Sequence, residues 1–203
     1  SQPPERLVQG GPDSLAREPV NYFDITVNGQ WRVFAHGRDP YLDGWTDTVQ
    51  IDYRKAATRR AMADILLSIA ERCDGARCDM AMLVQNDIFR NTWQEKAGLV
   101  PDDDFWNSVI PAVKIHFPDF IFIAESYWDT ERMMIDQGFD YCYDKKHYDF
   151  LKDGAENVMN HLAEIGEILP KTLHFIENQD EPRAAALYHA ERNKALALAS
   201  LTL

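Results

Sequence analysis

Residues 119–125, Asp-Phe-Ile-Phe-Ile-Ala-Glu, indicate the fold class of this chain. The run 120–124 is apolar throughout and has the length of a strand buried on both faces. Such strands are typical of parallel sheets, whose two faces are covered by helices. The carboxylate of Glu125 follows the run directly and is expected at the end of the strand. The segment therefore predicts an α/β protein with an acidic side chain at one edge of its sheet.

Outside this run, the apolar pattern predicts strands that alternate with helices. Residues 62, 65, 66 and 69 have the i, i+3, i+4, i+7 spacing of an amphipathic helix. Asp102 is expected to cap a later helix, and Pro111 to kink it. This alternation predicts βα units and a parallel sheet. The remaining expected strands lie at 76–80, 139–143, 172–176 and 201–203, and the remaining helices at 87–96, 155–169 and 182–199.

Residues 1–53 differ from the rest because they hold most of the Gly and Pro turn signals. We interpret them as a long irregular region with a hairpin around Asn28-Gly29. The regular pattern begins near residue 54. The sequence is therefore divided into segments 1–53 and 54–203.

Composition excludes several classes of function. The 203 residues carry a net charge of −12, so the chain is expected to repel nucleic acid and anionic membranes. A hydrophobic content of 45% excludes a wholly disordered chain. No run approaches the ~20 apolar residues that span a bilayer. Three cysteines indicate buried structural thiols rather than a disulfide framework. The compartment stays open, with the cytoplasm favoured.

Three carboxylates, Asp79, Glu125 and Asp180, each follow a predicted strand. Catalytic groups of parallel α/β folds gather at the carboxyl ends of strands, so these three are expected in one cleft. Taken alone, Asp79 could be a helix cap, and Asp180 could belong to a solvated acidic loop with Glu177 and Glu181. The six histidines show no metal-ligand spacing.

Local motifs resemble those of the α-amylase family, in the family's order. Residues 74–81, Asp-Gly-Ala-Arg-Cys-Asp-Met-Ala, are similar to the segment that ends the fourth barrel strand. Residues 122–128, Phe-Ile-Ala-Glu-Ser-Tyr-Trp, resemble the fifth-strand segment, and 175–180, Phe-Ile-Glu-Asn-Gln-Asp, the seventh. Residues 45–53 resemble the stretch near the end of the family's inserted loop domain.

The resemblance implies a (β/α)₈ barrel and a retaining, double-displacement glycoside hydrolase or transglycosylase acting on α-glucosidic bonds. Asp79 is then the nucleophile, Glu125 the acid/base, and Asp180 a stabiliser of the transition state. Arg77 lies two residues before Asp79, on the same face of the strand, and is expected to keep it ionised. Glu125 needs drier surroundings and a raised pKa.

The resemblance also implies substrate-binding residues. Gln179 stands where the family has a His that contacts the sugar, and Gln can still donate a hydrogen bond. For Tyr127 and Trp128, packing and a sugar platform are equally open. Met82 and Leu83 replace a Lys-His pair of a common calcium-binding context. No metal or other cofactor is expected.

The family's third-strand segment and first barrel strands are absent from the sequence. A closed barrel takes ~250 residues, so we expect about strands 4 to 7 or 8, with residues 1–53 as the tail of the inserted domain. The expected substrate is an α-glucan or a small α-glucoside. The alternative is a half-barrel that binds carbohydrate without turnover. Open sheet edges and an uncovered inner face favour a homodimer.

Overall fold

A computed structural model describes residues 4–187, apart from the side chain of Glu95. The chain divides into two compact units. The first comprises Ser1–Cys73 and Leu83–Pro118, and the second Asp74–Met82 and Asp119–Leu203. These bounds differ from the 53/54 division, whose assignment to parts of a larger barrel protein stays a prediction.

The first unit contains a three-stranded antiparallel sheet of order β1-β3-β2. Its strands are β1 (Gln9–Gly10), β2 (Tyr22–Val27) and β3 (Gln30–Ala35). The predicted hairpin at Asn28-Gly29 is confirmed, since these residues join β2 to β3 with φ of 51° and 76°. Two successive positive φ angles match the twist of the flanking strands, and Asn and Gly adopt them most readily.

The sheet packs against a helix that is distant in sequence. One buried cluster joins Val8, Tyr22, Val33 and Ala35 to Phe89, Trp93 and Ala97. Residues 1–53 therefore hold a three-stranded sheet beside the irregular stretches expected there, and three of the seven residues of this core come from a later segment.

The helices of the first unit mostly follow the predictions. The helix expected around residues 62–69 is confirmed as α2. The prediction that Asp102 caps the later helix is wrong, because Asp104 is the residue that directly precedes that helix. The carboxylate of Asp104 does not cap the helix but accepts the backbone N–H of Asn86 at 2.7 Å. Pro111 lies inside that helix. The elements are η1 (Pro4–Arg6), α1 (Pro12–Arg17), α2 (Ala56–Ala70), η2 (Ala81–Val84), α3 (Asn86–Trp93), η3 (Gln94–Ala97) and α4 (Phe105–His116), of which η2 crosses the boundary between the units.

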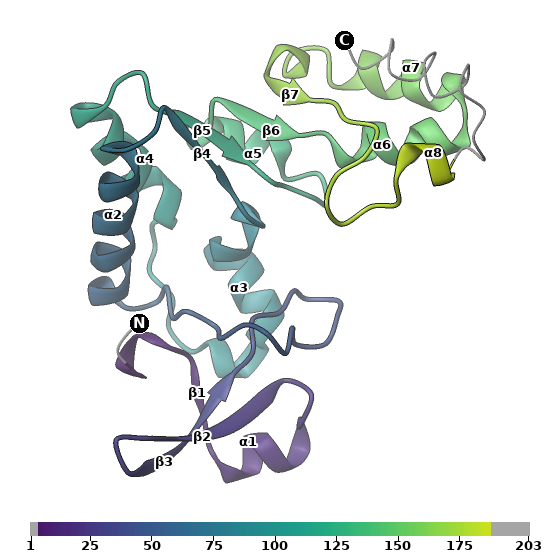
Figure 1. Cartoon of the computed structure of the whole chain (residues 1–203). Helices are drawn as coiled ribbons and strands as arrows, with labels where there is room; N and C mark the ends of the chain where they lie inside the picture. Colours follow the sequence, from purple (N-terminus) through teal and green to yellow (C-terminus); the bar gives the residue numbers. More distant parts are fainter. Residues whose placement is uncertain (1–3, 188–203) are drawn as a thin grey trace. The chain divides into compact units, whose positions relative to one another are not determined.

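The second unit contains a four-stranded parallel sheet in which consecutive strands are neighbours, in the order β4-β5-β6-β7 (Figure 1). The strands are β4 (Gly75–Cys78), β5 (Ile121–Ala124), β6 (Tyr141–Tyr143) and β7 (Thr172–Leu173). This sequential strand order is the one found in parallel β-barrels. Within residues 4–187 the sheet does not close. The predicted α/β class with a parallel sheet is confirmed.

Two helices of the second unit, α5 (Glu131–Asp136) and α6 (Lys145–Asp153), were not predicted from the sequence. Helix α6 follows Asp144, whose carboxylate accepts the N–H of His147 at 2.8 Å. The others are α7 (Ala155–Glu164), η4 (Leu169–Lys171) and α8 (Ala184–Leu187). The expected helix at 182–199 is described only as far as α8, and the expected strand at 201–203 lies outside the described residues.

Tight packing of the sheet depends on a glycine at the start of β4. A Cβ atom at Gly75 would lie 2.6 Å from the carbonyl oxygen of Ile121 on β5. Next to this contact, the side chains of Phe122 and Ala124 are fully buried. The strand is confirmed, with Glu125 at its carboxyl end, but burial on both faces is wrong: Ile121 is 40% exposed and Ile123 is half-buried, so within the described chain only the face of Phe122 and Ala124 is fully covered.

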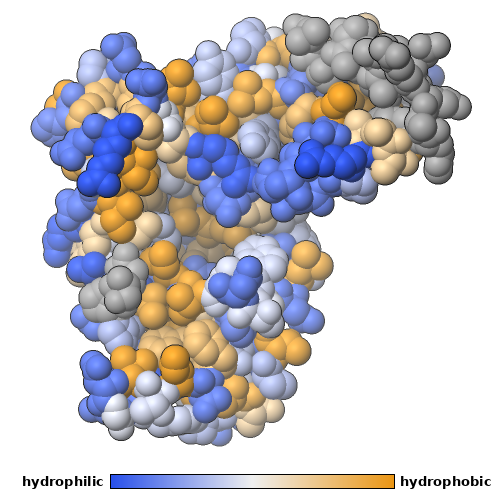
Figure 2. Space-filling model, in the orientation of Figure 1, coloured by the Kyte–Doolittle hydropathy of each residue, from blue (hydrophilic) through white to orange (hydrophobic). Residues whose placement is uncertain are grey.

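The surface shows two further features. No helix within the described part of the chain has both the length and the apolar character needed to cross a membrane. The cysteines form no disulfide, but Cys73 is exposed, so the prediction of buried thiols is wrong at that position. Figure 2 shows hydrophobic residues interspersed with hydrophilic ones on the face drawn.

Candidate active site

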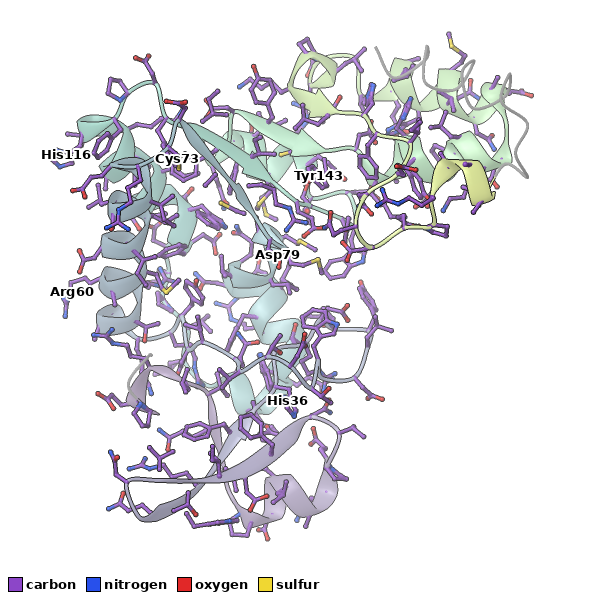
Figure 3. The ribbon with its side chains drawn as sticks, viewed as in Figure 1. His36, Arg60, Cys73, Asp79, His116 and Tyr143 are labelled. Carbon is purple, nitrogen blue, oxygen red and sulfur yellow. The ribbon has the colours of Figure 1, made fainter. Side chains whose placement is uncertain are left out.

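One guanidinium holds two acidic side chains at the ends of β4 and β5. Nη1 of Arg77 lies 2.8 Å from Oδ1 of Asp79, and Nη2 lies 2.7 Å from Oε1 of Glu125. Arg77 is on β4, Asp79 follows that strand (Figure 3), and Glu125 follows β5. The structure therefore brings together three of the predicted site residues.

Strand register explains why Glu125 reaches Asp79. Cys78 pairs with Ala124 in the parallel β4–β5 ladder, so the residues that follow them emerge side by side. The backbone N–H of Glu125 donates to the carbonyl of Cys78 at 3.0 Å. The backbone then turns at Met80, with φ of 43°, and the N–H of Met80 donates to Oε2 of Glu125 at 2.8 Å. Backbone hydrogen bonds thus fix the glutamate on both sides.

The two carboxyls have different surroundings. The side chain of Glu125 is 2% exposed, while that of Asp79 is 80% exposed. The hydroxyl of Tyr127 donates to Oε1 of Glu125 at 2.7 Å. Burial and this hydrogen bond both raise the pKa of Tyr127. The tyrosine therefore stays a hydrogen-bond donor to the glutamate.

The pKa values of the two carboxyls move in opposite directions. Burial raises the pKa of Glu125, and its hydrogen bond with Asp79 adds to this effect. The same hydrogen bond lowers the pKa of Asp79, as does the charge of Arg77. Of the two carboxyls, Glu125 therefore holds a proton more readily than Asp79, although Tyr127, the N–H of Met80 and Arg77 oppose the rise in the pKa of Glu125. These are the directions expected of an acid/base and a nucleophile.

Sequence reasoning missed Tyr143. The guanidinium of Arg77 lies 5.4 Å from the centroid of the Tyr143 ring. Although burial opposes it, a hydrogen bond with Tyr143 and the charges of Glu125 and Asp79 raise the pKa of Arg77. Tyr143 is the last residue of β6, the strand beside β5 (Figure 3). Its place at the end of a predicted strand was the signal that could have identified it.

The structure places Asp180 differently from the prediction. β7 ends at Leu173, so Asp180 belongs to a loop and not to a strand end. Nε2 of Gln179 donates to Oδ2 of Asp180 at 2.7 Å, and both side chains are exposed. Within residues 4–187, no hydrogen bond or ion pair joins Asp180 to Asp79 or Glu125. The negative charge of Asp180 nevertheless contributes to the raised pKa of Tyr127.

Trp128 lies on the loop after β5. Its side chain is partly exposed, and both Trp128 and Asp129 have positive φ angles, of 60° and 61°. Non-glycine residues in this region are held there by surrounding structure. The choice between packing residue and sugar platform stays open for Trp128.

Two histidine side chains contact the carboxylate of Asp144, and a third histidine stacks on one of them. Nε2 of His161 lies 2.8 Å from Oδ1 of Asp144, and Nε2 of His174 lies 3.2 Å from Oδ2. His147 stacks on His174 and is fully buried, and burial lowers the pKa of His147 to about 4. Over the described ranges, no group of three or more potential ligands is arranged to hold a metal ion.

Similar folds occur among solved structures of α-amylases. An α-amylase from H. orenii shares 17% identity with a TM-score of 0.62, over 98% of this chain and 41% of its own. The cyclic α-maltosyl-(1→6)-maltose hydrolase of Arthrobacter globiformis shares 16% identity with a TM-score of 0.62, over 93% and 43%. For an α-amylase from Lactobacillus plantarum, the identity is 20% and the TM-score 0.55, over 91% and 44%.

These likenesses confirm the resemblance at the level of the fold. The chain spans about two fifths of the length of the solved structures that it matches, which fits a partial barrel. No protein-family model and no curated protein matches the sequence.

Proposed function

We propose that the chain is part of the catalytic domain of an α-amylase-family glycosidase that cleaves α-glucosidic bonds with retention. Residues 54–203 are the C-terminal half of its barrel, and residues 1–53 the tail of an inserted loop domain. The observation that carries the proposal is the Arg77-bound pair of Asp79 and Glu125, with pKa values shifted in opposite directions.

The binding of both carboxyls to one guanidinium supports retention over inversion. Retaining enzymes have their two carboxyls ~5–5.5 Å apart, whereas inverting enzymes leave ~6.5–9.5 Å for a water molecule. Asp79 and Glu125 share a hydrogen bond and one guanidinium. This close contact is unlike the wider separation of an inverting pair, and we assign Asp79 as the nucleophile.

The reaction then has two steps. A carboxylate oxygen of Asp79 attacks the anomeric carbon, while the proton of Glu125 passes to the departing glycosidic oxygen. This step breaks the glycosidic bond and forms a glycosyl ester on Asp79. In the second step, Glu125 takes a proton from water, or from a sugar hydroxyl in transfer, and the oxygen of that acceptor displaces Asp79. Both carboxyls return to their starting protonation states.

The surrounding residues are assigned supporting roles. Asp180 stabilises the developing positive charge of the sugar, and Gln179 donates a hydrogen bond to one of its hydroxyls. Arg77 keeps Asp79 ionised. Tyr127 holds Glu125 in place, and Trp128 provides an aromatic surface at the sugar-binding side.

The proposed substrate is an α-glucan or a small α-glucoside, which places the chain in carbohydrate metabolism. The Arthrobacter enzyme is described in complex with cyclic α-maltosyl-(1→6)-maltose, and a Geobacillus thermoleovorans α-amylase in complex with acarbose. Both ligands are α-linked, which supports the substrate class proposed for this chain.

Covalent labelling tests the proposal without requiring repeated turnover. 5-Fluoro-α-D-glucosyl fluoride carries an activated leaving group, and its ring fluorine slows release of the glycosyl enzyme. We expect peptide mass spectrometry to find the sugar on Asp79. Asp79→Asn abolishes the label, whereas Glu125→Gln retains it because fluoride leaves without a proton. A label on any other residue contradicts the assignment.

Turnover distinguishes the enzyme from a binding half-barrel. Release of nitrophenol from nitrophenyl α-glucoside by the 203-residue chain is expected to be slow, since barrel strands that would complete the site are absent from the sequence. Robust release that Asp79→Asn abolishes would establish a working enzyme. Binding of acarbose with neither label nor turnover would support the non-catalytic alternative.

We further propose a homodimer. The parallel sheet ends at β4 and β7, and within the described chain neither outer edge has a strand partner. Unpaired strand edges invite pairing with another chain. Two-fold association through an edge or the inner face would bury more than ~1,000 Å². Light scattering at micromolar concentration is expected to give twice the monomer mass, and a stable monomer would contradict the proposal.

A further inference from the structure

The loop that carries Asp180 is shaped locally by an asparagine. Oδ1 of Asn178 accepts the backbone N–H groups of Asp180 and of Glu181, both at 2.9 Å. This turn fixes the conformation of three residues. It does not determine where the turn lies relative to the ends of β4 and β5, because every one of these contacts is within the loop.

Contacts of Glu181 with helix α6 connect the turn to the rest of the unit. Oε1 of Glu181 lies 2.9 Å from Nζ of Lys145, and Oε2 lies 3.8 Å from Nζ of Lys152. The Glu181 side chain is 19% exposed. Hydrogen bonds with Lys145 and Tyr148 outweigh burial and lower its pKa, so Glu181 stays ionised at neutral pH. The residue next to Asp180 is therefore held by two cations.

The ring of Tyr148 contacts both lysines that bind Glu181; we call these contacts of Glu181 with Lys145 and Lys152 the loop anchor. The side chain of Tyr148 is fully buried, and the two ammonium groups lie over its ring, at 4.9 Å for Lys145 and 4.0 Å for Lys152. A buried aromatic face limits the positions that the two flexible lysine side chains can take. Tyr148 thus fixes both the cations and the carboxylate that they bind.

The same ring is connected to the carboxylate pair through stacked aromatic residues. Tyr148 stacks on Phe175 with centroids 5.4 Å apart and planes at 16°. Phe175 contacts the ring of Tyr143, also at 5.4 Å, and Tyr143 lies under the guanidinium of Arg77. A continuous set of contacts therefore runs from Arg77, which binds Asp79 and Glu125, to the anchor of the Asp180 loop.

We propose that Glu181 and Tyr148 are positioning residues that set Asp180 against the Asp79–Glu125 pair. The inference rests on the proposed function for the role of Asp180 in the reaction, and on the contacts above for the anchoring of the loop. Neither residue touches the reacting sugar. They act through the turn at Asn178 and through Phe175.

Hydrogen exchange tests the anchor without relying on activity. In Glu181→Gln, the Asp180 backbone amide is expected to exchange about fivefold faster or more, because two ion pairs to the side chain are weakened. Tyr148→Phe keeps the ring and should produce a smaller increase. The matched control is Glu167→Gln, which removes an exposed ion pair with Arg132 in the same unit. Exchange in Glu181→Gln no faster than in this control would overturn the proposal.

Labelling by 5-fluoro-α-D-glucosyl fluoride then tests the connection to Asp180. Glu181→Gln should slow labelling of Asp79 several-fold at saturating probe, with little change in the probe concentration that gives half-maximal rate. In an Asp180→Asn background, the same substitution should cause no further loss. Equal losses in both backgrounds, with a matching fall in Tm, would show a merely structural role and overturn the proposal. The Asp180 amide of Glu181→Gln could exchange faster while Asp79 of the unsubstituted chain takes no sugar label. That result would support the anchoring of the loop and contradict the proposed function.

Discussion

The ends of β4 and β5 and the loop after β7 each carry a proposed catalytic carboxylate, but they are held in different ways. Glu125 is positioned by strand register, backbone hydrogen bonds and burial. Asp180 is exposed and is positioned by a turn and by ion pairs of its neighbour Glu181. In this comparison, strand register and burial position Glu125, a side chain of β4 binds Asp79, and Asp180 is proposed to depend on side chains of helix α6.

The largest expected effect comes from removing the guanidinium that binds both strand-end carboxyls. Arg77→Met removes the guanidinium that contacts both Asp79 and Glu125, and the loss is expected to exceed the ~1 kcal/mol that an exposed ion pair contributes at most. Urea unfolding measures this loss in the free energy of unfolding. Lys145→Met, which removes a cation from the loop anchor, should cost less. Similar losses for the two variants would remove the distinction between the regions.

The pH dependence of stability provides a second test of the strand-end pair. The pKa of Glu125 is raised in the folded chain, so its contribution to stability is fully present below its ordinary value of 4.5 and is lost as pH rises through the raised value. Asp79 has a lowered pKa and contributes in the opposite sense, losing its stabilisation as pH falls through the lowered value.

The difference in the free energy of unfolding between the unsubstituted chain and Glu125→Gln isolates the contribution of Glu125. Gln cannot ionise, so the variant should lack the loss of stability above pH 4.5 that Glu125 causes. Urea unfolding at a series of pH values measures the difference. Parallel stability curves for the two proteins would show that Glu125 titrates normally.

The smallest expected effect belongs to the loop. Gln179 is exposed and donates to Asp180, so Gln179→Ala should change the free energy of unfolding by no more than ~0.5 kcal/mol. Its effect should appear instead in the rate at which the sugar probe labels Asp79. A stability loss as large as that of Arg77→Met would mean that the loop is part of the core.

The strand-end pair could be predicted from sequence because its signals are local. The apolar run at 120–124 identifies a strand, and the spacing of Arg77 and Asp79 puts both on one face. The position of Asp180 could not be predicted in this way. β7 has two residues, and the contacts that place the loop come from α6, a helix with few apolar positions whose main signal is the cap at Asp144.

The core of the first unit shows the same limit. Residues 1–53 carry too few periodic apolar side chains to specify a core. The apolar core that packs against their sheet is completed by Phe89 and Trp93, which lie far along the chain. Local composition could predict the hairpin at Asn28-Gly29, but not the partner that buries one of its faces.

The partly exposed lysine–glutamate contacts at Glu181 make one part of the proposed site sensitive to ionic strength. At 1 M salt the Debye length falls to ~3 Å, so the attraction between Glu181 and the lysines of α6 is weakened, whereas the buried contact of Arg77 with Glu125 is screened much less. Salt is therefore expected to loosen the carboxylate proposed to stabilise the transition state, and also the exposed ion pair of Asp79 with Arg77, while Glu125 keeps its buried position. A relative that works at high salt would need an uncharged contact in place of the Glu181 ion pairs. A relative that works at low ionic strength would not.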